Sequence, residues 1–171
     1  MDTLMIVLRL IHIFAGIIWL GFGLFLLLLL IPTARQLGPE GQAFMKGFLK
    51  HSAFNKIMPV VSLLTTIAGA WLYYKVSDGF NADYMGSHGG IVLSIGVLAG
   101  LLAFGHGATA TGPMSEKMVK LNDALDAQDG PPSPEQIAEL QSVQRKMGLH
   151  GRISVALMII AVAGMVSARY V

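Results

Sequence analysis

The sequence predicts an all-α fold, an integral membrane four-helix bundle that forms a single domain. Apolar residues make up 54% of the chain and charged residues only 13%, against about 25% charged in a typical soluble domain. Four apolar segments, at about 4–31, 54–75, 90–111 and 147–169, are each long enough to cross a hydrocarbon core of about 30 Å as a helix. They lack the period-two alternation of barrel strands, which leaves helices as the spanning structure.

The expected helix ends follow from prolines and capping residues. Pro32 is expected to end the first span, and Gly112-Pro113 the third, because proline removes a backbone donor. The second helix is expected to begin before Phe54, near Gln42. Ser133 followed by Pro134 predicts the start of the fourth helix in water, ahead of its apolar part.

Residues 115–127 have apolar side chains at helical spacing, at Met118, Leu121 and Leu125, with charges between them. This pattern predicts a short amphipathic helix on the membrane surface before the fourth span.

Charge and composition restrict the environment of the chain. By the positive-inside rule the first and third loops face the cytoplasm of a bacterium, so both termini lie outside its cytoplasmic membrane. These loops hold Arg35, Lys46, Lys50, Lys117, Lys120, Arg145 and Lys146. The lipid bilayer is the expected partner, and a scattered net charge of +2 argues against nucleic acid. The chain has no cysteine, which excludes iron–sulfur clusters and haem attachment through its own thiols.

Histidines are the candidate metal ligands. His12, His51, His106 and His150 lie on the four separate spans or at their mouths, whereas His88 lies in the second loop. A histidine inside a membrane span costs several kcal/mol unless it faces the bundle interior and has a hydrogen-bonding partner. Each could be a helix–helix hydrogen-bonder, but one histidine per helix favours a bound cofactor. Neutral imidazole is a standard ligand of b-type haem iron.

Small residues share helix faces with these histidines, as a flat macrocycle between helices would require. The predicted cofactor-binding residues are Arg9, Gly16, Trp19, Gly100, Ala103, Gly107 and Ser154. On the second helix, the polar side shared with His51 carries Asn55, Ser62, Thr65, Thr66 and Gly69. Ordinary small-residue packing between spans is the alternative interpretation of these stripes.

Counting residues from the helix ends predicts the depth of each histidine. His106 and His150 lie roughly 24 and 28 Å from the outer ends of their helices, so they could hold one haem iron between them. His12 lies in the outer half, where a second haem could bind. His51 is a reserve ligand or a partner for a haem propionate, and Arg9 either pairs with a propionate or extends to the outer headgroups.

Other metal sites fit the sequence less well. The four spans contain no Asp or Glu, which argues against a carboxylate-bridged metal pair. The ten methionines are mostly spread through apolar segments, which is typical of core packing rather than of a copper site.

The segment at residues 10–21, LIHIFAGIIWLG, resembles the first helix of the CopD-like membrane family, whose wider relatives include HemJ-type protoporphyrinogen oxidases. The shared pattern is a histidine followed by Trp-x-Gly, here His12, Trp19 and Gly21. The sequence around 149–154 and 168–170 is similar to small bacterial members of the group. The resemblance implies a b-type haem in a four-helix bundle, with His12 as a ligand, and a redox role. HemJ-type enzymes carry a lysine in the third span, and residues 90–111 here contain none.

The hypothesis from the sequence is a b-type cytochrome that transfers electrons in the membrane, with one or two haems. Quinone or another redox protein is the expected partner, and a homo-oligomer is compatible with the sequence. The alternatives are a HemJ-like oxidoreductase of haem biosynthesis and a CopD-like copper-handling protein.

Overall fold

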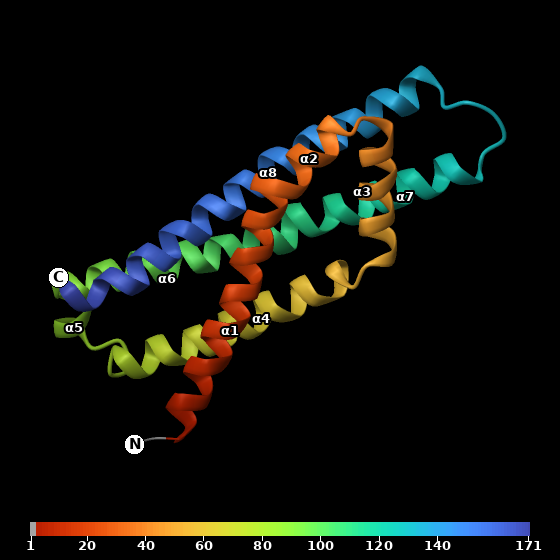
Figure 1. Ribbon diagram of the computed structural model, residues 1–171. Helices are drawn as coiled ribbons and strands as arrows, with labels where there is room; N and C mark the ends of the chain where they lie inside the picture. Colours follow the sequence, from red (N-terminus) through yellow and green to blue (C-terminus); the bar gives the residue numbers. More distant parts are fainter. Residues whose placement is uncertain (1–2) are drawn as a thin grey trace.

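The computed structural model describes residues 3–171, and within them it contains helices and no strand (Figure 1). The helices are α1 (Thr3–Phe25), α2 (Ile31–Gln36), α3 (Pro39–His51), α4 (Phe54–Val76), α5 (Ala82–Gly86), α6 (His88–His106), α7 (Gly112–Ala127) and α8 (Pro134–Ser167). Two π-helical turns, η1 (Leu26–Leu30) and η2 (Gly107–Thr111), join α1 to α2 and α6 to α7, and a 3-10 turn, η3 (Ala168–Tyr170), follows α8.

Four continuous helices are long and apolar enough to cross a membrane: Thr3–Gln36, Phe54–Val76, His88–Ala127 and Pro134–Tyr170. Their outward side chains are apolar, and Phe14, Ile17 and Leu28 each expose more than 60% of their surface. Such a surface suits lipid rather than water. The predicted all-α membrane bundle is therefore confirmed.

The bundle consists of two helix pairs, α1 with α4 and α6 with α8, which make the most extensive contacts in the molecule. Figure 1 shows α6 and α8 running alongside each other while α1 crosses them. The pairs meet around a small core of Ala103, Val155 and Met158, against which Trp19 packs from α1. This core is small, so most of the packing lies within the two helix pairs. Further contacts join the pairs, among them the hydrogen bond between the hydroxyls of Tyr73 in α4 and Ser94 in α6 at 2.6 Å.

The prediction that Pro32 ends the first helix is wrong. The chain makes one π turn, in which the Ile31 N–H donates to the carbonyl of Leu26, and the helix then continues to Gln36. Pro32 thereby occupies the first turn of α2, where proline is tolerated because no donor is needed there. The direction of the chain changes only at Gly38, whose φ is 60°, a value that glycine adopts easily.

A π turn also allows the third helix to continue through Gly112-Pro113, where it was expected to end. The Gly112 N–H donates to the carbonyl of Gly107 across η2, and Pro113 falls in the first turn of α7. The amphipathic helix predicted at 115–127 is present, but it continues the third span rather than forming a separate surface helix.

The expectation of a second helix that begins near Gln42 is half right. Residues 39–51 are helical, but α3 ends at His51 and α4 begins anew at Phe54. At the break Ser52 is extended, with ψ of 160°, and its hydroxyl accepts a hydrogen bond from the Phe54 N–H at 3.2 Å. The predicted start of α8 is confirmed, with Ser133 and Gln136 forming a capping box.

Ion pairs connect the helices at the end of the bundle that contains α3 and α7, called here the α7 end. Lys46 pairs with Asp126, Lys50 with Asp123 at 2.6 Å, and Lys117 with Glu139 at 2.7 Å. The first two join α3 to α7, and the third joins α7 to α8. The opposite end contains α5 and the chain terminus beside the start of α6, and is called the α5 end.

Candidate functional site

Two histidines on facing membrane helices touch each other. His106 is the last residue of α6, and its Nε2 lies 3.1 Å from Nδ1 of His150 in α8. The ring centroids are 5.0 Å apart, and both side chains are half-buried. One nitrogen of the contact must carry the proton and the other must accept it, because a neutral imidazole has one donor and one acceptor. The two imidazoles predicted at similar depth are thus direct partners.

Glycines bring α6 and α8 together on the α5 side of this pair. A Cβ on Gly164 would lie 2.8 Å from Cα of Gly96, so the two backbones are in contact there. Small residues permit such an approach between membrane helices. Gly105, Gly107 and Gly151 are the chain neighbours of the two histidines, and a Cβ on any of them would meet nothing within 4 Å. Adjacent residues of a helix do not share a face, so this open space does not lie at the contact between the two imidazoles.

A π turn follows His106 directly. The turn η2 offsets the helix register by one residue, and Thr111 at its end lies with its hydroxyl oxygen 3.4 Å from that of Ser154. Ser154 is one turn after His150 on α8, so four polar side chains gather between α6 and α8. Single π turns occur frequently at functional sites.

His12 is held differently, in the interface between α1 and α4. Its Nδ1 donates to the backbone carbonyl of Thr65 at 2.8 Å, since a carbonyl oxygen can only accept. A Cβ on Gly69 would lie 2.6 Å from Cε1 of the His12 ring, so glycine makes room for the imidazole. This bond fixes the tautomer and leaves the lone pair on Nε2, an arrangement common among metal-ligating histidines. Thr65 Oγ1 is buried beside it and has no hydrogen-bond partner among residues 3–171.

The polar side of α4 was expected to belong with His51, and the structure places it elsewhere. Thr65 and Gly69 face His12, and Asn55 accepts a hydrogen bond from Ser115 of α7. His51 is exposed at the end of α3. Spacing along α4 shows the polar side, but not which neighbouring helix it meets.

The predicted small residues occupy helix contacts. Gly16 faces Thr65, with a Cβ position 3.6 Å from its methyl carbon, and Gly100 faces Ala161 at 3.8 Å. Ala103 is fully buried. These contacts are what close helix packing requires, and a role for the same residues in cofactor binding stays a prediction.

The remaining predicted residues differ in exposure. Trp19 packs against the core between the helix pairs, whereas Arg9 is exposed near the N-terminal end of α1. Gly107 borders open space beside His106. His88, expected to be only a loop residue, is exposed as the first residue of α6.

The described part of the chain contains no group of three or more His, Cys, Asp or Glu side chains placed to hold a metal ion. A haem iron needs fewer ligands from the protein than a free metal ion does. The macrocycle fills four coordination positions, and the protein supplies only one or two ligands. Two nitrogens that share a metal lie about 4 Å apart, twice a metal–nitrogen bond. The two nitrogens, now 3.1 Å apart, would therefore have to separate by about 1 Å, and the macrocycle would need further room between α6 and α8.

Comparison with protein families, with curated proteins and with solved structures gave no match for this chain. The geometry of the site is consequently the basis for assigning a function.

Proposed function

We propose that the protein is a small b-type cytochrome in which His106 and His150 would hold one haem through their imidazole nitrogens. The observation that carries this proposal is the direct contact between two half-buried imidazoles on different membrane helices. Each is a neutral nitrogen ligand of the kind that b-type haem iron takes.

The residues around the pair suit this role. Haem, when bound, supplies the one-electron redox change. The chain supplies two nitrogen ligands, the apolar surroundings of α6 and α8, and the hydroxyls of Thr111 and Ser154 near the ligands. Burial and hydrogen bonding to ligands are the means by which a protein tunes such a centre.

The distribution of basic residues suggests how the protein is oriented in the membrane. Because basic residues concentrate at the α7 end, we place that end in the cytoplasm of a bacterium. The histidine pair then lies toward the cytoplasmic side, where it would exchange electrons with quinone or another redox protein. His12 lies toward the other side with its Nε2 lone pair available, which favours a second haem there.

The proposal is tested by haem content. Protein produced with a haem supply should give a Soret band and a sharp reduced α-band, and pyridine haemochrome gives the stoichiometry. His106→Ala and His150→Ala should each lose the haem, while His51→Ala and His88→Ala, which change exposed side chains, should retain it. His12→Ala should lower the stoichiometry by one if a second haem is bound.

The variant His150→Gly distinguishes the loss of a ligand from misfolding of the protein. Free imidazole added to this variant should restore the spectrum if the lost group was only a ligand. A colourless wild-type protein, or full haem content in both His106→Ala and His150→Ala, would refute the proposal.

A further inference from the structure

Three arginines gather where α2 meets α8, at the α7 end of the bundle. Arg35 lies near the end of α2, and its Nη2 is 3.9 Å from the Cβ position of Gly148 in α8. Arg145 and Arg152 lie three residues before and four residues after Gly148, so they share its face of the helix. All three arginines are exposed, and Figure 1 shows α2 running beside α8 at this end. These three residues are called here the arginine cluster.

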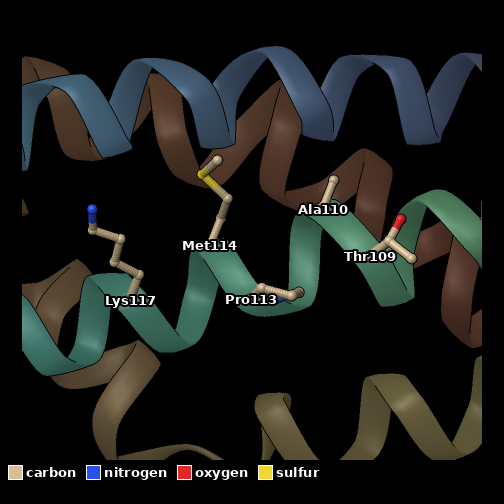
Figure 2. A pocket seen from close by; sticks show the side chains of 5 residues that line it. All are labelled: Thr109, Ala110, Pro113, Met114 and Lys117. Carbon is tan, nitrogen blue, oxygen red and sulfur yellow. The ribbon is translucent and has the colours of Figure 1, made fainter.

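The arginine cluster differs from the lysines of the same end in having no carboxylate partner. Lys46, Lys50 and Lys117 are each paired with a carboxylate. Figure 2 shows Lys117, which lines a groove beside α7 and is already engaged by Glu139 at 2.7 Å. Within residues 3–171, none of the three guanidinium groups forms an ion pair or a hydrogen bond. Like charges repel one another, so the cluster favours an anionic ligand.

The arginine cluster lies at the level where a membrane surface is expected. The apolar part of the first span ends near residue 31, and that of the fourth begins near residue 147. Counting along the helices places Arg35 and Arg145 roughly 6 and 3 Å outside the apolar segments, and Arg152 roughly 8 Å inside. An arginine inside a span is expensive unless its long side chain reaches the headgroups or a partner. Toward the membrane interior the surface becomes apolar, with Leu28 and Ile159 exposed.

The arginine cluster is separate from the histidine pair. Successive residues of a helix turn by about 100°, so His150 projects from α8 on the side opposite to Gly148 and Arg152. His150 contacts His106 of α6, whereas the arginines lie on the side of α2. A group held between α6 and α8 is therefore not the anion that the cluster fits, and the inference below does not depend on the proposed function.

We infer that Arg35, Arg145 and Arg152 bind the phosphate groups of an anionic phospholipid, whose acyl chains lie against the exposed apolar side chains of α1 and α8. A guanidinium group stays charged and pairs with phosphate through two parallel hydrogen bonds. Basic pockets between membrane helices recognise lipid headgroups in this way. Arg145 and Arg152 are roughly 11 Å apart along α8, with Arg35 between them. Cardiolipin is the probe that matches this spread, because it offers two phosphates to three arginines.

The test measures lipid binding to the delipidated full-length protein in maltoside detergent by native mass spectrometry. Cardiolipin should bind the wild type more tightly than zwitterionic phosphatidylcholine does. Arg35→Gln, Arg145→Gln and Arg152→Gln should each weaken cardiolipin binding about fivefold, because one cationic side chain near a membrane surface contributes about this factor. Arg152→Lys keeps the charge but loses the two parallel hydrogen bonds, so it should weaken binding less than Arg152→Gln does. Melting in the same detergent shows that each variant is folded.

Lys146→Gln is the matched control. Lys146 is exposed and adjacent to Arg145, but it lies two residues from Gly148 and therefore on the opposite side of α8. This variant should bind cardiolipin as the wild type does.

Equal binding of cardiolipin to the wild type and to the three glutamine variants of the cluster, or an equal loss with Lys146→Gln, would overturn the inference. Displacement of cardiolipin by excess inorganic phosphate would also overturn it, because the arginines would then bind a soluble anion. Failure of the proposed function is recognised separately, since a wild-type protein without haem would still bind cardiolipin through the arginine cluster.

Discussion

The two helix interfaces of this protein each hold histidine, but in opposite ways. Between α1 and α4, the single imidazole of His12 is bonded to the backbone carbonyl of Thr65 and enclosed by Gly69. Between α6 and α8, His106 and His150 have each other as partners at 3.1 Å. The first arrangement fixes a ring in place, whereas the second can part by moving two side chains.

This difference shows that a histidine between membrane helices can be held by a backbone group or only by another side chain. A backbone carbonyl cannot leave its helix, so the His12 bond is lost only if the His12 ring itself turns. The imidazole pair is bonded only through side chains, and a metal that replaced the shared proton would satisfy both nitrogens. Buried polar groups are expensive when unpaired, which explains why the two rings contact each other.

The largest effect is expected from tightening the α6–α8 contact. Gly164→Ala would place a Cβ 2.8 Å from Cα of Gly96, and a backbone atom cannot move aside as a flexible side chain can. Overpacking of this kind should destabilise the protein by about 1–3 kcal/mol. Unfolding in mixed micelles measures the change. Gly105→Ala, on α6 where a Cβ meets nothing, is the control and should be neutral or slightly stabilising; equal loss in both variants would contradict the close contact.

A smaller effect is expected from displacing His12. Gly69→Ala puts a Cβ 2.6 Å from the His12 ring, so the ring must turn and give up its bond to Thr65. The loss of one hydrogen bond should cost about 1 kcal/mol, measured in the same unfolding experiment. Gly21→Ala, on α1 with open space around it, should not show this loss. If Gly69→Ala left the stability unchanged, the enclosed histidine of the first interface would be refuted.

The smallest effect is expected from the ion pairs that join α3 to α7 and so tie the two helix pairs together. The hydrogen bond and charge of Asp123 raise the pKa of Lys50 above its ordinary value of 10.5. A raised pKa means that the stabilisation is complete below the ordinary value and is lost as the pH rises through the folded-state pKa. The difference in melting temperature between wild type and Lys50→Gln should therefore vanish in strong base, and also in high salt. A difference that persists under both conditions would show that Lys50 acts by packing.

Hydropathy was sufficient to predict four membrane helices, because lipid leaves few alternatives to a span. Counting along straight helices predicted a similar depth for His106 and His150, and in the structure the two rings are in contact. The helix ends at Pro32 and Pro113 were predicted wrongly, because a π turn before each proline restarts the helix and removes the need for its N–H. Proline alone does not reveal the preceding turn.

The sequence did not predict which helix faces contact one another. The polar side of α4 was visible from spacing, yet its contact is His12 on α1 and not His51. The Gly96–Gly164 contact between α6 and α8 depends on how two helices cross, and glycines at similar spacing occur on α1 as well. The ligand roles of all four histidines stay predictions.

The most direct test of the histidine pair is electron paramagnetic resonance of the ferric protein. Two imidazole ligands should give a low-spin signal, which His106→Ala and His150→Ala should each abolish or convert to a high-spin signal. His12→Ala should leave that component unchanged. If that component survived unchanged in both His106→Ala and His150→Ala, or disappeared in His12→Ala alone, the iron would not be held by the pair between α6 and α8.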